Sequence, residues 1–300
     1  MSFLNPVNEP VLRFKSTDAG APQIDYNARV AGDVKAVLKA CLVTGYGATA
    51  SAGWSVVNEV GHVAEFVSPS AAMSDYRLGV DDTSTSSTTW YYQYQNVRVN
   101  PLANQPKKSI SSINKTHASN GWQLFTTPQA ILLIEIVYNN GINQNMVRAT
   151  YLGSLKSAVP NTIGKNIAFW NTGIAGQRDT FNLFSTASSA HLHAVIEGYT
   201  AIGFDSSLIR IISDRNKVFD TSSVDVIDGL ILSQGSLFIA KHPAITLRTT
   251  NNIEDIWGLQ EVVVDSRPML KVCLGYENGS LSFLQSYCIV MLISTDYWEF

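Results

Sequence analysis

Charged side chains are scarce in this chain. They make up 15% of its 300 residues, and the net charge is only -3; an average globular protein has about 25% charged residues. The longest basic run is the pair Lys107-Lys108. Because nucleic-acid binding needs clustered positive charge, we expect no nucleic-acid partner. Low charge with abundant serine, threonine and asparagine instead favours β-rich surfaces that contact other proteins.

The sequence also lacks long apolar segments and a secretory pattern. The apolar run Ala130–Tyr138 has nine residues, whereas a membrane-spanning helix needs about 20. Met1–Pro6 has neither the basic stretch nor the apolar stretch of a secretory signal. We therefore expect no membrane partner and a protein that folds in a cytoplasm.

Cysteine is rare as well, with three residues in the chain. An odd number favours reduced thiols over a disulfide framework. Cys273 and Cys288 flank a predicted hairpin at Glu277–Ser280, where a two-residue turn would place Leu284 opposite Cys273. We expect no disulfide in that register.

One short amphipathic helix is predicted near residues 33–44. Asp33 stands where an N-cap residue is expected, and Gly45 is the expected stop because a helix end commonly needs a left-handed residue. Such a helix must be covered by the rest of the fold, because one side of it is apolar. The apolar stripe recurs at helical spacing and consists of Val34, Val37, Leu38, Cys41 and Leu42.

Most of the remaining chain is predicted to form strands. The fold class that this pattern indicates is mainly β, with antiparallel β-sandwich or barrel-like units and the one N-terminal helix. Regular spacing of the runs favours meanders over crossovers. Length suggests an N-terminal β-rich domain at 1–150 and a C-terminal β-rich region at 151–300, or one continuous domain. The β-branched or aromatic runs begin at Trp54, His62, Tyr76, Trp90, Trp122, Ala130, Glu261, Met269 and Ser286.

Residue patterns that support catalysis are absent from the sequence. It contains no glycine-rich phosphate loop, no Gly-x-Ser-x-Gly elbow and no Cys-x-x-Cys pair, and its acidic residues are scattered. We expect no enzyme activity and no cofactor.

Three polar groups deserve separate interpretation. His191 and His193 share one face of a predicted strand, but two imidazoles do not complete a metal site, so ordinary strand histidines are favoured. Asp81-Asp82 precedes a Thr/Ser-rich run without the ligand spacing of a calcium loop, which indicates a polar hairpin tip. Glu135 interrupts an apolar strand, which indicates an edge or interface position or a raised pKa. Without a second acid beside it, the interface is favoured.

Aromatic residues form the one surface with a ligand-binding pattern. Trp90, Tyr92 and Tyr94 fall on one face of a predicted strand, and Tyr91 falls on the other. A row of rings can stack on sugars, anchor a protein partner or fill a sandwich core. A core or subunit interface is favoured, with carbohydrate recognition as the alternative.

Four segments have a distinctive pattern: Phe14–Pro22, Ala40–Gly47, Gly53–Trp54 and Tyr76–Asp82. Together they resemble the structural proteins of tailed-bacteriophage particles. The resemblance covers the first half of the chain and continues in weaker form at Gly121–Leu124 and Gly235–Ala240. The chain departs from the family pattern in the Asn/Gln-rich segment 139–145 and from around Arg248 onward.

The resemblance implies a non-enzymatic structural component of a virion and supplies no catalytic residues. Such a protein acts by surface burial in the tail, neck or baseplate, or as head decoration, in many symmetric copies. The implied partners are other virion proteins and further copies of the chain, and the implied location is the virion, assembled in the host cytoplasm. The alternative is a receptor- or glycan-binding module of a phage fibre or spike, with a host-surface glycan as its partner.

Overall fold

The computed structural model is mainly β, with antiparallel sheets and one short helix, which confirms the predicted fold class. It describes residues 7–24, 30–74, 76–83, 93–98, 108–112, 118–139, 144–157, 166–171, 192–196, 210–211, 226–227, 231–234, 237–250, 259–273 and 288–300. The helical elements of that part are α1 (Asp33–Lys39), a π-helical turn η1 (Ala40–Thr44) and a 3₁₀ turn η2 (Ala71–Met73).

The helix forms where the sequence predicts it. All five apolar residues of its stripe are fully buried, at 0% exposure. η1 continues α1 by one wide turn, in which the Gly45 N–H donates to the Ala40 carbonyl at 2.8 Å. Gly45 then has a φ of 74°, a left-handed value that ends the helix as predicted.

The predicted N-cap is wrong. Asp33 is the first residue of α1, and the residue before it is Gly32, whose φ of 95° lies in the left-handed region. The Val34 N–H in the first turn donates to Asp82 Oδ2 at 2.9 Å. Asp82 is fully buried and directly follows strand β5 (Tyr76–Asp81). The cap therefore comes from the neighbouring sheet, where a carboxylate satisfies a helix donor and complements the helix dipole.

The first sheet is an antiparallel meander, as the spacing predicts. Its strands lie side by side in chain order. The edge strand β3 has a bulge between Val57 and Val60, where Asn58 has a φ of 51°. Besides β5, the strands are β3 (Ser55–Val60), β4 (Val63–Val67), β6 (Gln93–Arg98) and β7 (Lys108–Ser112).

The central sheet has six antiparallel strands in the order β13-β12-β10-β9-β8-β2. In β9, residues 130–134 are at most 1% exposed. This run is buried on both faces of the sheet, which explains why it is apolar without alternation. The strands are β2 (Leu12–Lys15), β8 (Ala118–Thr127), β9 (Ala130–Asn139), β10 (Gln144–Ser154), β12 (Asn166–Asn171) and β13 (Leu192–Ile196).

Three smaller β-structures complete the described part. They are a sheet ordered β15-β18-β21-β20-β19, a sheet ordered β11-β17-β16-β14, and a ribbon of β1 and β22. Their strands are β1 (Asn8–Pro10), β11 (Lys156–Ser157), β14 (Arg210–Ile211), β15 (Val226–Ile227), β16 (Ile231–Gln234), β17 (Leu237–Lys241), β18 (Ile245–Thr250), β19 (Leu259–Val264), β20 (Arg267–Cys273), β21 (Cys288–Ser294) and β22 (Tyr297–Glu299).

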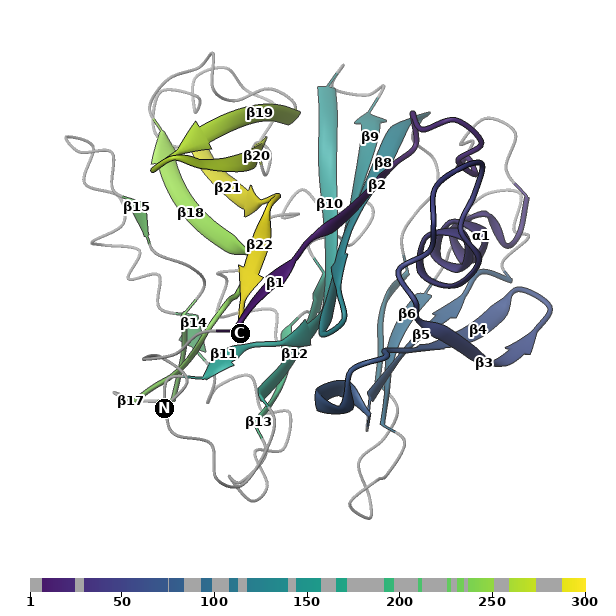
Figure 1. Cartoon of the computed structure of the whole chain (residues 1–300), viewed down its shortest axis with the longest axis horizontal. Coiled ribbons are helices and arrows are strands. Elements are labelled where there is room, and N and C mark those ends of the chain that lie inside the picture. Colours follow the sequence, from purple (N-terminus) through teal and green to yellow (C-terminus); the bar gives the residue numbers. More distant parts are fainter. Residues whose placement is uncertain are drawn as a thin grey trace.

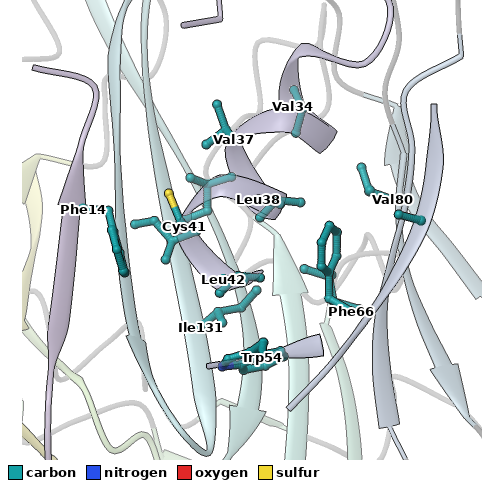
Figure 2. Close-up of a cluster of buried hydrophobic side chains, with 14 of the residues drawn as sticks. Phe14, Val34, Val37, Leu38, Cys41, Leu42, Trp54, Phe66, Val80 and Ile131 are labelled. Carbon is teal, nitrogen blue, oxygen red and sulfur yellow. The ribbon is translucent and has the colours of Figure 1, made fainter. Parts of the chain in front are cut away.

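The central sheet separates two apolar cores (Figure 1). Strands β2, β8, β9 and β10 stand between α1 with β3–β6 on one side and β18–β21 on the other. We call these the helix-side core and the far-side core. Figure 2 shows the α1 stripe filling the space between the central strands and the first sheet. Besides that stripe, the helix-side core includes Phe14, Phe66, Val80, Trp122, Leu124, Ile131, Leu133 and Leu152.

The far-side core covers the opposite face of the central sheet. Residues there alternate with those of the helix-side core along β8, β9 and β10. The Tyr151 ring lies 4.3 Å from the His242 ring and 6.4 Å from the Trp298 ring. Other buried residues on this side are Phe125, Leu132, Ile134, Ile245, Leu270, Val272, Met291 and Ile293.

The two ends of the described chain lie side by side. β1 pairs with β22, and Val7 and Phe300 exchange two backbone hydrogen bonds of 3.0 Å. β10 spans residue 150 and pairs with both β9 and β12. Strand pairing thus continues across the border between residues 1–150 and 151–300.

The register near the C-terminus differs from the predicted hairpin. Cys273 pairs with Val290 rather than with Leu284. Residues 274–287, between β20 and β21, lie outside the described residues. Cys288 itself pairs with Thr250 of β18.

Candidate functional site

The predicted aromatic row is described only in part. Trp90 and Tyr92 lie outside the described residues. Tyr94 lies on β6, in register with Val80 on one side and Ile110 on the other. Glycan stacking by this row stays a prediction.

The other polar groups fall in different places. His191 lies outside the described residues, and His193 lies on β13 opposite Phe169. Asp81 accepts hydrogen bonds from the Thr83 N–H and hydroxyl at 3.1 and 2.6 Å, as in a local turn. Asp82 is buried as the helix cap rather than exposed at a tip. In the part of the chain that is described, no group of three or more His, Cys, Asp or Glu residues could hold a metal ion.

The predicted interface position of Glu135 is wrong. Glu135 lies on β9, which has β8 and β10 on its two sides, so it is not at a sheet edge. Its side chain is 1% exposed within the single chain. The register places it between Trp122 and Arg148. The carboxylate is therefore part of the interior, and another subunit is not needed to cover it.

The N-terminal turn, Lys15–Pro22, is locked to the loop after the helix. Asp18 Oδ2 accepts hydrogen bonds from the Lys15 N–H and the Tyr46 hydroxyl, both at 2.8 Å. Burial raises the pKa of the Cys41 thiol, and the nearby Asp18 charge adds to the rise. Burial, and then the hydrogen bond to Asp18, likewise raise the pKa of Tyr46. Both groups stay neutral near pH 7, so this cluster provides no nucleophile.

Two glycines allow that turn and that loop to touch through their backbones. Gly47 has a φ of 54°, and a Cβ atom there would lie 2.4 Å from the Ala19 carbonyl oxygen. Gly20 has a φ of 81°, and a Cβ atom there would lie 3.2 Å from the Gly47 nitrogen. Side chains at these positions would push the two segments apart.

The same turn is also tied to the central sheet. The Ser16 N–H donates to the Trp122 carbonyl at 3.0 Å, and Ser16 Oγ accepts the Trp122 N–H at 3.1 Å. The Trp122 indole N–H donates to the Pro22 carbonyl at 3.0 Å. Polar side chains of the turn are thus used to fix the backbone. We call the N-terminal turn, the Gly45–Gly47 loop, Asp82 and Trp122 together the N-terminal lock.

An ion network holds the chain ends on the far side. Arg267 donates to Asp296 Oδ1 at 3.0 Å and to the Tyr297 carbonyl at 2.8 Å, and its guanidinium lies 3.8 Å from the Tyr297 ring centre. Glu299 pairs with Lys156 at 2.7 Å. Partial burial opposes the charge on Asp296, but the hydrogen bonds led by that from Arg267 lower the pKa of this carboxyl. The network fixes β22 to β20 and β11.

Two edge strands differ in their protection against strand addition. β3 carries the bulge at Asn58, and Lys35 and Lys39 of α1 hold Glu59 at 2.9 and 2.7 Å. β19 is regular, pairs only with β20 among the described strands, and exposes Val263 at 73%. The charge on β19 is Glu261, which pairs with Arg13 of β2. A bulge on an edge discourages strand addition, whereas a regular edge permits it. Of the edges compared, β19 is the better suited to another protein.

No protein-family model, curated protein or solved structure matches this chain. Among the residues that the structure describes, no helix is long and apolar enough to cross a bilayer. Function must therefore be inferred from the chain's own contacts and surfaces.

Sequence reasoning misses two residues that organise these contacts. Asp82 has one usable signal, its position directly after an alternating strand, where a side chain can reach the next element of the fold. Arg267 has none, because its partners Asp296 and Glu299 become neighbours only when β20 and β22 meet.

Proposed function

We propose that this protein is a non-enzymatic structural component of a tailed-phage virion. It acts by protein–protein assembly in the tail, neck or baseplate or as head decoration, and its partners are other virion proteins and further copies of itself. Assembly in the host cytoplasm and location in the virion follow from that role.

The observation that carries the proposal is the N-terminal lock. Three of the segments that resemble virion proteins, Phe14–Pro22, Ala40–Gly47 and Tyr76–Asp82, contribute to it, and Gly121–Leu124 joins them through Trp122. Their polar groups hold backbone and helix in place. A rigid unit of this kind supports assembly because its surfaces are presented in one fixed arrangement.

The β19 edge supports the same role. Its outward backbone groups and the exposed Val263 suit a strand from a neighbouring virion protein. Stable association would bury more than about 1,000 Å², so the edge would be one part of a larger interface.

Mass spectrometry of purified virions tests the proposal. The chain should be found at an integral multiple of the portal or tail symmetry, or in far more copies if it decorates the head. Val263→Lys should lower its amount per particle, because a charge blocks strand addition. Val60→Lys is the matched control, since Val60 is exposed at 76% on the bulged edge β3. Absence from virions, with the protein abundant in infected cells, would contradict the proposal.

A further inference from the structure

A buried histidine lies beneath the paired chain ends. His242 belongs to the three-residue link between β17 and β18 and is 3% exposed. In the same link, the Pro243 carbonyl accepts the Glu299 N–H at 3.4 Å, and the Ala244 carbonyl accepts the Ser294 N–H at 2.9 Å. The first of these bonds ties the link to β22, and the second ties it to the end of β21. β22 in turn holds β1.

The contacts of His242 require a neutral ring. Its Nδ1 atom accepts the Ala244 N–H at 3.2 Å, which places the single ring hydrogen on Nε2. Its ring packs against Tyr151, which packs against Trp298. Protonation would put a hydrogen on Nδ1 facing the Ala244 N–H and would place a charge among apolar rings.

The charged groups around the link do not offset that cost. Glu9 of β1 acts electrostatically on Tyr151, whose pKa burial raises well above its ordinary value. Lys156 of β11 and Arg267 of β20 both face Glu299 of β22, at 2.7 and 3.7 Å. Burial accordingly lowers the pKa of the histidine to about 3.

We propose that the link is an acid-sensitive latch, in which a charge on His242 releases β22 and β1 together, and Trp298 with them, while β8, β9 and the helix-side core stay folded. A charged ring needs water, and lifting the ribbon would supply it. Besides its ion network with Arg267 and Lys156, the ribbon is held by three register pairs, whereas β8 and β9 are held by nine. Local openings follow such differences in pairing and burial.

The pH dependence of the latch follows from the pKa of His242 in the closed and in the open state. A released histidine has a pKa of about 6.5, whereas that of the buried ring is about 3. The closed state is therefore fully stable above about pH 6.5, and its stability falls as the pH drops toward 3. Over that window the opening constant should rise about tenfold for each pH unit.

Hydrogen exchange of the full chain, followed by mass spectrometry at pH 7.5 and 4.5 and corrected for intrinsic rates, tests the latch. Protection of residues 7–12 and 295–300 should fall about 100-fold at pH 4.5, while β8 and β9 stay protected. His242→Asn offers an oxygen to the Ala244 N–H without a titrating ring, so it should keep the ribbon protected. His62→Asn, at an exposed histidine, should behave as wild type.

Three results would overturn the latch. They are unchanged ribbon protection in the wild type, an equal loss in His242→Asn, and a simultaneous loss in β8 and β9. If His242→Asn does not fold, nuclear magnetic resonance of the five histidines decides. The signals of one histidine, His242, should show a neutral ring until the ribbon opens. Titration of all five near pH 6.5 with a protected ribbon would also overturn the proposal.

Discussion

The two cores on either side of the central sheet differ in how far apart their residues lie in the chain. The helix-side core is drawn from residues 14–152 and is closed by the N-terminal lock. The far-side core joins β8, β9 and β10 to residues after 240 and is closed by the ribbon of both chain ends. Contacts distant in sequence form late and open first when they are few. The far side should therefore open before the helix side when the protein is destabilised.

The largest expected effect breaks the helix-side core. Leu38 is fully buried, and Leu38→Asp should abolish soluble folding, because a buried unpaired carboxylate costs several kcal/mol against a total stability of about 5–15 kcal/mol. Soluble yield and thermal melting measure this. Ala36→Asp, at an exposed position of the same helix, is the control and should stay folded. A wild-type melting temperature in Leu38→Asp would mean that the stripe faces solvent.

A smaller loss is expected from the backbone contact in the N-terminal lock. Gly47→Ala should destabilise the protein by about 2–4 kcal/mol, because it combines a left-handed alanine with a clash. Gly61 has nearly the same φ, 55°, but no atom within 4 Å of an added Cβ. Gly61→Ala should therefore cost only about 1–2 kcal/mol. Equal losses of the two variants in urea unfolding would show that the contact with Ala19 contributes nothing.

Features that depend on neighbouring residues could be predicted from the sequence. The apolar stripe on α1, the stop at Gly45 and the meander of β3–β7 all follow from local spacing and turn residues. The apolar run at the start of β9 likewise favours a buried strand. These features lie mainly around the helix-side core, where consecutive elements pack against each other.

Features that depend on distant partners could not be predicted. The preference of aspartate for the N-cap position favours Asp33 as the helix cap. In the structure Asp82, 48 residues away from the capped Val34, takes that role. Glu135 is buried because its strand lies inside the sheet, a fact that its own neighbours in sequence do not reveal. His242 shows no local pattern at all, since the ring that it packs against, Tyr151, comes from β10.

The cap provides a third test of the helix side. Asp82→Ala should cost about 0.5–2 kcal/mol, the range of a lost helix cap. Asp33→Ala should cost less, because Asp33 accepts the Val30 N–H at 3.3 Å in an exposed contact. Chemical denaturation of both variants measures the difference. A larger loss of stability in Asp33→Ala than in Asp82→Ala would mean that Asp33 is the helix cap, as the sequence predicts.

The smallest expected effect is a gain in stability from a change in the β19–β20 turn on the far side. Val264 pairs with Arg267, so Asp265 and Ser266 form a two-residue turn, with φ values of 50° and 64°. Positive φ at both positions is the type I′ pattern, for which Asn-Gly is the most favourable pair. Replacing Asp265-Ser266 by Asn-Gly should therefore stabilise the hairpin by about 0.5–1 kcal/mol.

Thermal melting and hydrogen exchange separate two results of that change. If the two cores unfold together, the melting temperature of the whole protein should rise. If the far side opens first, exchange protection should rise in β19 and β20 and not in β8 and β9. Ser266→Ala keeps a side chain at a left-handed position and is the matched control, with no gain expected. A gain in this control equal to that of Asn-Gly would show that backbone conformation does not limit the hairpin.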